Sequence, residues 1–171
     1  MEETLRDQAQ ARRMTDDDQK FMARAIELAR QGIDDNAGGP FGCVVVKDGQ
    51  IVGEGNNRVT STNDPTAHAE VVAIRDACER LGSFQLEGCT VYTSCEPCPM
   101  CLGAIYWARP AAIYYAGTRA DAAHAGFDDE HFYTEIEKPN DERQLRMVNL
   151  LRDEAQAVFQ HWIDKPDKTE Y

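Results

Sequence analysis

The most informative parts of this chain are two short stretches, His68-Ala69-Glu70 and, further along, Cys95-Glu96-Pro97-Cys98-Pro99-Met100-Cys101. His68, Cys98 and Cys101 supply one imidazole and two thiolates, a three-ligand set for a zinc ion with an open fourth position. A water in that position becomes nucleophilic at neutral pH because zinc lowers its pKa. Glu70 follows the histidine by two residues, where a carboxylate can move that water's protons. The two stretches therefore predict a catalytic site that holds one zinc ion per subunit.

Each half of this pattern has other interpretations when it is taken alone. A Cys-x-x-Cys pair also occurs in redox sites and in structural zinc fingers. A structural zinc site normally has four protein ligands, and Cys95 is a candidate for the fourth. Cys95, Cys98 and Cys101 also look like an iron–sulfur ligand series, but no cysteine follows Cys101 to complete it. The two halves together favour catalytic zinc over a structural metal or a redox pair.

The order of apolar patterns predicts an α/β fold, with a mixed sheet of about five strands and helices on both of its faces. Strands are expected over residues 41–46, 51–57, 90–93, 111–116 and 143–150, and helices over residues 15–32, 68–81, 98–108 and 152–163. The consecutive Val44, Val45 and Val46 indicate a strand that is buried on both faces. Asp48-Gly49 is typical of a hairpin turn, and residues 58–66 are expected to form a loop.

The predicted helix starts carry two further expectations. Thr15 and the three aspartates after it are typical of a helix N-terminus. Residues 15–171 are therefore expected to form one catalytic domain, preceded by a polar extension of residues 1–14.

Cys98 and Cys101 lie in the first turn of their helix, where free backbone N–H groups and the helix dipole lower a thiol pKa. That position favours the thiolates that zinc needs.

Composition and cysteine usage indicate a cytoplasmic protein that does not contact a membrane. Hydrophobic residues make up 42% of the 171 residues and charged residues 28%, as in ordinary globular proteins. No stretch approaches the roughly 20 apolar residues of a membrane span, and the N-terminus has no apolar run typical of a signal peptide. The six cysteines are unevenly spaced in a chain of one-domain size, which favours metal binding over disulfides.

The charge of the chain argues against a polyanionic partner. The net charge is −12, and the acidic excess deepens towards the C-terminus. Proteins that bind nucleic acids gain affinity from lysine and arginine contacts to phosphates. This sequence has no basic run beyond Arg12-Arg13. We therefore expect no nucleic-acid partner, and a small neutral substrate fits the composition better.

Longer segments around the motifs resemble one family. They are GGPFG at 38–42, NDPTAHAE at 63–70, YTSCEPCPMCLGAIYWA at 92–108 and DAAHAGFDD at 121–129, together with the C-terminal Tyr171. His-x-Glu followed by Pro-Cys-x-x-Cys is the signature of zinc-dependent base deaminases. On these residues the chain resembles the cytidine-deaminase-like superfamily, and within it the bacterial guanine deaminases, over about residues 16–171.

The resemblance implies a three-layer α/β/α sandwich and the hydrolysis of guanine to xanthine and ammonia, in purine salvage and catabolism. It implies that Asn57 and Asp129 hold the base, that Phe41 stacks on its ring, and that Ala69 belongs to the substrate site. The family's dimers exchange C-terminal segments, so the resemblance also implies a homodimer. Tyr171 would then help to close the active site of a partner subunit.

Other functions and simpler roles stay open on the sequence alone. A tRNA adenosine deaminase has the same metal chemistry, and a deaminase of cytosine or isocytosine could share zinc and Glu70. A zinc-stabilised binding module would need a fourth protein ligand. Asn57 could be an ordinary turn residue, Phe41 a core residue, Asp129 a solvated loop residue and Tyr171 a frayed terminus.

Overall fold

The computed structural model describes residues 14–171, so nearly all of the predicted extension of residues 1–14 lies outside the described part. The strands are β1 Gly42–Lys47, β2 Gln50–Asn56, β3 Thr90–Cys95 and β4 Ala112–Gly117. The helices are α2 Asp16–Asp34, α3 Val59–Thr62, α4 Ala69–Leu81, α5 Pro99–Ala108, α6 Arg119–His124, α7 Glu130–Glu137 and α8 Arg152–Asp164. Within the described residues, no helix is long and apolar enough to cross a membrane.

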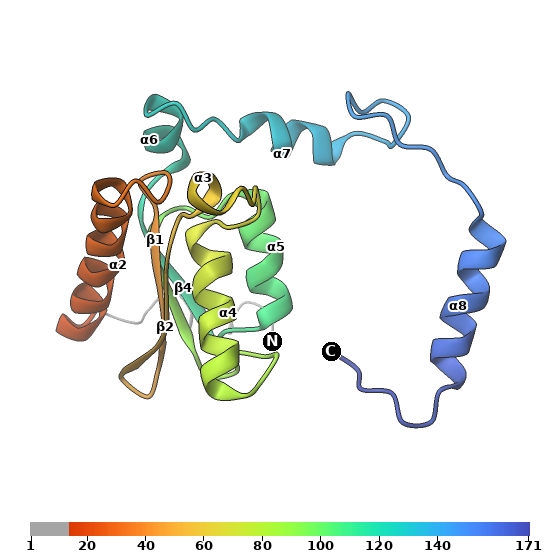
Figure 1. The fold of residues 1–171 in the computed structure, drawn as a ribbon, viewed down its shortest axis with the longest axis horizontal. Coiled ribbons are helices and arrows are strands. Elements are labelled where there is room, and N and C mark those ends of the chain that lie inside the picture. The colour runs from red at the N-terminus through yellow and green to blue at the C-terminus, as the bar shows by residue number, and fades with distance from the viewer. Residues whose placement is uncertain (1–13) are drawn as a thin grey trace, which may run out of the picture.

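The four strands form one mixed sheet in the order β2-β1-β3-β4. β1 pairs antiparallel with β2 and β3, whereas β3 pairs parallel with β4. Helix α2 covers one face of the sheet, and α4 and α5 cover the other (Figure 1). The predicted three-layer α/β/α arrangement and its mixed sheet are therefore confirmed.

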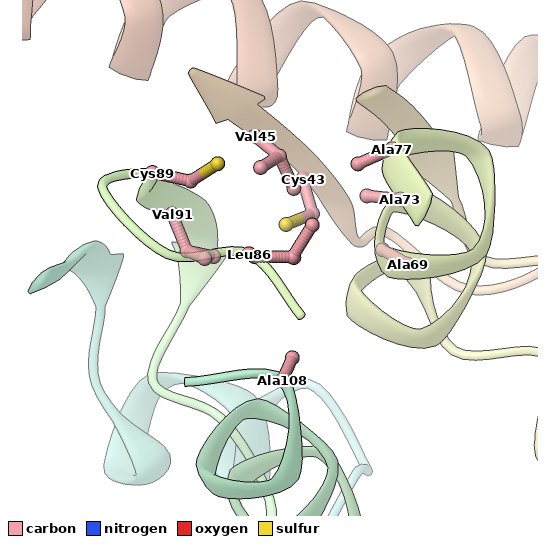
Figure 2. Close-up of a cluster of buried hydrophobic side chains, with 9 residues drawn as sticks. All are labelled: Cys43, Val45, Ala69, Ala73, Ala77, Leu86, Cys89, Val91 and Ala108. Atoms are coloured by element: carbon pink, nitrogen blue, oxygen red, sulfur yellow. The ribbon is translucent and has the colours of Figure 1, made fainter. Parts of the chain in front are cut away.

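Alternation along the central strands gives each face its own core. Val44, Val46 and Tyr92 pack with Phe21 of α2. Cys43, Val45 and Val91 point to the opposite face, where they meet the alanines of α4 and Ala108 at the end of α5 (Figure 2). The prediction that the valine run is buried on both faces is confirmed, because Val44, Val45 and Val46 are all buried.

The helix starts follow the local sequence. Thr15 forms a capping box with Asp18, whose backbone N–H donates to the threonine hydroxyl at 3.1 Å. Helix α2 continues past Gly32 to Asp34, two residues beyond the predicted end. Gly82 adopts a left-handed conformation with φ of 61° and ends α4 as expected.

Helix α4 lies unusually close to β2 because two glycines of the strand face it. A Cβ on Gly53 would lie 2.5 Å from the carbonyl oxygen of Ala73 and 2.6 Å from the Cβ of Ala77. A Cβ on Gly55 would lie 2.6 Å from the backbone nitrogen of Ala73. Only glycine permits this approach of two backbones. The close packing fixes the position of the helix that begins just after His68.

We expect Gly55→Ala to lower the free energy of unfolding by about 1–3 kcal/mol, because the new methyl group must displace the backbone of α4. Gly103→Ala is the matched control, since nothing lies within 4 Å of a Cβ at that helical position. The control should be neutral or stabilise the protein by up to about 1 kcal/mol through helix propensity. Urea denaturation of both variants measures the difference. Equal stabilities would contradict the packing argument.

The predicted fifth strand over residues 143–150 is wrong, since the sheet has four strands. A strand needs a neighbouring edge to bond its backbone, and this segment instead folds back on the end of α7. The Arg143 side chain donates to the carbonyl oxygens of Glu135, Ile136 and Lys138. The alternating Leu145 and Met147 are exposed rather than packed on the sheet.

Three short helices were not predicted. The segment expected as a loop contains α3, and the polar stretch after β4 contains α6 and α7. Thr118 begins α6 with a capping box that includes Asp121, a local signal that the sequence does contain. These helices lie across the end of the sheet where α4 and α5 begin (Figure 1).

The C-terminal segment forms a separate arm. Helix α8 stands away from the sheet in Figure 1, and the chain then returns towards α4 and α5. Val158, Phe159 and Trp162 on α8 are exposed. Tyr171 lies near the rings of Phe84 and Trp107, with centroids 6.3 and 5.8 Å away.

Candidate zinc site and active-site cavity

Two helix starts bring the predicted metal ligands together. His68 is the N-cap residue of α4 and Cys98 the N-cap residue of α5, and both have extended backbones. Cys101 is buried in the first turn of α5. The Nδ1 atom of His68 lies 3.6 Å from the Sγ of Cys98 and 3.5 Å from the Sγ of Cys101.

These distances match a tetrahedral zinc ion. Zn–N bonds of about 2.0–2.1 Å and Zn–S bonds of about 2.3 Å place a nitrogen and a sulfur ligand about 3.6 Å apart. In residues 14–171, the three ligand atoms form the one group of His, Cys, Asp or Glu that could hold a metal, with all atoms within 4.8 Å of one another. Cys95 is outside this group, and its thiol lies 3.6 Å from the carbonyl oxygen of Thr118. A structural site with Cys95 as fourth ligand therefore does not fit.

The protonation of the two thiols also suits a cation. Hydrogen bonding from the Cys101 thiol lowers the pKa of Cys98 to about 4, despite its partial burial. The same contact raises the pKa of Cys101, because its thiolate would face that of Cys98. A hydrogen bond with Cys98 raises the pKa of His68. Without a metal the site holds one thiolate and one thiol, whereas a bound dication stabilises both as thiolates.

Glu70 lies in the first turn of α4, beside the ligand group. Its side chain is buried, and burial raises the pKa of its carboxyl group above the ordinary value. The hydroxyl of Thr93 donates to Glu70 Oε1 at 3.1 Å. Thr93 was not predicted as a site residue, although strand alternation places it on the same face as Val91, towards α4. This contact helps to fix the orientation of the carboxylate.

A cavity of about 390 Å³ opens in front of these residues. Its size suits a single planar base. The cavity is lined by His68, Glu70 and Cys98 together with Gly39, Phe41, Asn57, Cys95, Glu96, Arg119, Phe127, Asp128, Asp129 and Phe132. The structure therefore brings the metal ligands, Glu70, Asn57, Phe41 and Asp129 to one place.

The orientation of Asn57 is fixed by the backbone around it. Its Oδ1 accepts hydrogen bonds from the N–H groups of Gly39 and Val59, both at 3.2 Å. A Cβ on Gly38 would collide with this oxygen, so the position requires glycine. Because Oδ1 is occupied, the amide that Asn57 offers to the cavity is its NH₂ donor. The sequence predicted this residue but not which of its atoms faces the cavity.

Two aromatic rings and Asp129 also line the cavity. Phe41 and Phe127 make an edge-to-face pair with centroids 5.0 Å apart. Asp129 is the N-cap residue of α7. Burial raises the pKa of Asp129 and the nearby Cys98 adds to this, while Arg119 lowers it. These residues thus give the cavity a flat apolar surface and, from Asp129, a hydrogen-bond acceptor.

Two predicted substrate residues lie elsewhere in this single chain. Ala69 is fully buried against β2 and does not line the cavity. Tyr171 packs near Trp107, also outside the cavity. Their roles in binding the substrate stay predictions. Phe127, Phe132 and Arg119 line the cavity and were not predicted, because their segment has only a weak sequence pattern.

Comparisons with known proteins agree with this geometry. The family model of the cytidine and deoxycytidylate deaminase zinc-binding region matches residues 15–117. The guanine deaminase of Bacillus subtilis (strain 168) is 56% identical over 151 residues, which cover 88% of this chain and 97% of the relative. A crystal structure of guanine deaminase from Bacillus subtilis superposes with a TM-score of 0.88 at 54% identity, covering 92% of this chain and 99% of that one.

The similarity to tRNA-editing enzymes is shorter. The tRNA-specific adenosine deaminase of Aquifex aeolicus is 41% identical over 87 residues, which cover 51% of this chain and 56% of that protein. The match to the Bacillus guanine deaminase, in contrast, extends over the α6–α8 region as well as the metal motifs, as its coverage shows. The chain therefore belongs to the cytidine and deoxycytidylate deaminase family of zinc enzymes and, within it, to the guanine deaminases.

Proposed function

We propose that this protein hydrolyses guanine to xanthine and ammonia, in purine salvage and catabolism. The observation that carries the proposal is the cavity lined by two of the three zinc ligands, His68 and Cys98, and by Glu70, Asn57 and Asp129, with the Asn57 NH₂ left free of its backbone contacts. The zinc ligands and Glu70 supply hydrolytic chemistry, and Asn57 and Asp129 supply a donor and an acceptor for a purine edge.

His68, Cys98 and Cys101 would hold the zinc ion, which supplies a Lewis acid that makes a water nucleophilic near neutral pH. Glu70 takes the proton of that water and passes it to the ring nitrogen beside the attacked carbon, which bears the amino group. Glu70 then takes the proton of the hydroxyl group newly bonded to that carbon and delivers it to the amino group, which leaves as ammonia while the carbonyl of the product forms. Its raised pKa, caused by burial, suits a group that must both accept and return a proton.

The base is held by complementary polar groups. The Asn57 NH₂ donates to an acceptor on the purine, while Asp129 accepts from an N–H group of the purine. Phe41 and Phe127 provide the apolar surface for its ring. A base that leaves either polar group unpaired is rejected, because an unpaired buried donor or acceptor costs free energy.

We expect Asn57→Asp to lower kcat/KM for guanine by on the order of 10- to 100-fold, mainly through KM. One carboxylate oxygen can still accept from Gly39 and Val59, but the other replaces the NH₂ donor and repels the acceptor of the base. Asn36→Asp makes the same chemical change at an exposed position and is the control. Steady-state kinetics separate the two. Wild-type kinetics in Asn57→Asp would remove this residue from base recognition.

Ammonia release by the zinc-loaded protein tests the function directly. Guanine is compared with cytosine, isocytosine, adenine and a tRNA that carries a wobble adenosine. Release from guanine, with xanthine as product, is the expected result. Release from the tRNA alone would overturn the proposal and with it the argument from the net charge of −12. Release from another small base would keep the zinc chemistry and replace the substrate.

We further propose a cytoplasmic homodimer in which residues 15–171 act as one catalytic domain and the C-terminal arms are exchanged. All six cysteines are free, which suits a reducing compartment. Helix α8 leaves Val158, Phe159 and Trp162 exposed, and a second subunit would cover such an apolar face. Tyr171 then reaches the partner's cavity. A monomeric sedimentation coefficient would contradict this arrangement.

A further inference from the structure

One wall of the cavity carries Asp129, and it joins the loop before Cys98 through a small number of contacts. This wall, residues 118–137, follows β4 and contains α6 and α7. Beside its start, the backbone N–H of Glu96 donates to the carbonyl oxygen of Gly117 at 2.8 Å. Beyond that point the wall must be held in place by side chains, because α6 and α7 have no buried residues.

Arg119 makes several of these side-chain contacts. Its backbone N–H donates to Glu96 Oε2 at 3.2 Å, and its Nε lies 3.3 Å from Glu96 Oε1. Its guanidinium carbon lies 4.5 Å from the centroid of the Tyr133 ring. The hydroxyl of Tyr133 in turn donates to the carbonyl oxygen of Pro97 at 3.3 Å. Arg119 therefore bridges the start of α6, the loop before Cys98, and the middle of α7.

The residue that is proposed to bind the base belongs to the segment that this bridge spans. Asp129 lies between Arg119 and Tyr133 in the chain, at the N-cap of α7. Arg119 and Tyr133 both reach the loop that leads into Cys98, the first metal ligand of α5. The Phe41–Phe127 contact anchors this wall beside Asn57, whereas the bridge is what ties Asp129 to the loop that carries Cys98.

We propose that Arg119 is a positioning residue that holds Asp129 at the correct distance from the zinc ligands for a purine, by bridging Glu96 and Tyr133. The inference rests on the proposed binding of guanine by Asp129 and extends it to a residue that acts through Asp129. An arginine suits the position because its planar group stacks on an aromatic ring while its Nε faces a carboxylate. Lysine has neither the plane nor the Nε.

The exposure of the Arg119–Glu96 ion pair indicates that it positions Asp129 rather than stabilises the fold. The side chain of Arg119 is 48% exposed and that of Glu96 30%. An ion pair with this exposure contributes little to stability. Misplacing a binding group by about 1 Å, in contrast, can cost on the order of 100-fold in rate. Removing the bridge is therefore expected to lower kcat/KM without changing the unfolding midpoint.

The first test compares Arg119→Met with Arg80→Met, which removes an arginine of similar exposure from a helical ion pair on α4. Arg119→Met is expected to lower kcat/KM for guanine by about 10- to 100-fold, mainly through KM, with zinc content and unfolding midpoint unchanged. Arg80→Met should behave as wild type. Arg119→Lys should recover only part of the loss. An effect of Arg119→Met below twofold would overturn the proposal.

A double-mutant cycle with Asp129→Asn tests whether Arg119 acts through Asp129. If it does, adding Arg119→Met to Asp129→Asn lowers kcat/KM by less than about threefold further, because the positioned group is already lost. Fully additive losses would mean that Arg119 contacts the base itself, and would overturn a positioning role. Tyr133→Phe keeps the ring under Arg119 and should be milder than Tyr133→Leu.

A readout without substrate keeps this proposal separate from the proposed function. In the zinc-loaded protein, hydrogen exchange of the amides of residues 127–133 should be faster in Arg119→Met than in Arg80→Met. Unchanged exchange would refute the bridge even if guanine is the substrate. Faster exchange in a protein that does not release ammonia from guanine would uphold the bridge and refute the function.

Discussion

Replacing Glu70 by glutamine is expected to lower kcat for guanine by 10²- to 10⁴-fold, about the usual contribution of a general acid–base group. The amide has nearly the same shape, and its oxygen can still accept from Thr93, which donates at 3.1 Å in the wild-type protein. Fold and zinc content should therefore be retained. What is lost is the ability to take a proton from water and to return it to the leaving ammonia.

Glu79→Gln is the matched control, because Glu79 lies on the same helix and is exposed. Steady-state kinetics and zinc analysis of both variants give the comparison. Turnover by Glu70→Gln within tenfold of wild type would remove Glu70 from the proton-transfer role. Loss of zinc together with activity would instead show that the carboxylate supports the metal site.

Although Glu70→Gln should lower kcat, it should raise the stability of the metal-free protein at higher pH. Burial raises the pKa of Glu70, so the folded protein without metal binds a proton more tightly at this residue than the unfolded chain does. The stability of the metal-free protein therefore falls as the pH rises from the ordinary glutamate pKa through the folded value. Glu70→Gln removes this dependence, so above that range the variant without metal should be the more stable protein.

Replacing Cys101 by serine should abolish zinc binding and reduce turnover to the background rate. A serine hydroxyl does not ionise near neutral pH and is a poor zinc ligand, and the remaining pair of ligands cannot hold the ion. Zinc content after dialysis and ammonia release are the measurements. Cys78→Ser, outside the ligand group, should keep both. A Cys101→Ser protein with full zinc and full activity would contradict the ligand assignment.

Metal binding should also release protons. Without metal, Cys98 is already a thiolate near neutral pH, since its pKa is lowered to about 4, whereas the pKa of Cys101 is raised. Binding of zinc must then expel the proton of Cys101, so zinc affinity falls as the pH is lowered.

The sequence predicted well those parts of the fold that depend on short-range signals. Thr15 and the aspartates after it marked the start of α2, and Asp48-Gly49 marked the turn between β1 and β2. The prediction for residues 143–150 failed because their alternating apolar residues match a strand pattern, whereas the segment pairs with neither edge strand of the sheet, β2 or β4. Local pattern carries no information about which edge is available.

The candidate site divides in the same way. The sequence predicted the ligands His68, Cys98 and Cys101, because their residue types and spacing alone identify them as a zinc-binding set. The direction of Asn57 depends on backbone N–H groups before and after it in the chain, and the bridge of Arg119 depends on Glu96, 23 residues away in sequence. The contact between Gly39 and Asn57 forms only when β1 and β2 pair, and the contact between Arg119 and Glu96 only when β3 and β4 pair.

Strand β3 has one further consequence for how this protein can change during evolution. Tyr92 points to one layer, where its hydroxyl donates to Asp18 of α2 at 2.5 Å, and its neighbour Thr93 points to the other layer and donates to Glu70. Inserting or deleting a single residue within β3 would turn each of these side chains towards the wrong layer. Changes in length among descendants of this chain are therefore expected in the exposed turn of residues 82–84, before the fully buried Leu86 and Cys89, and not in the six residues of β3.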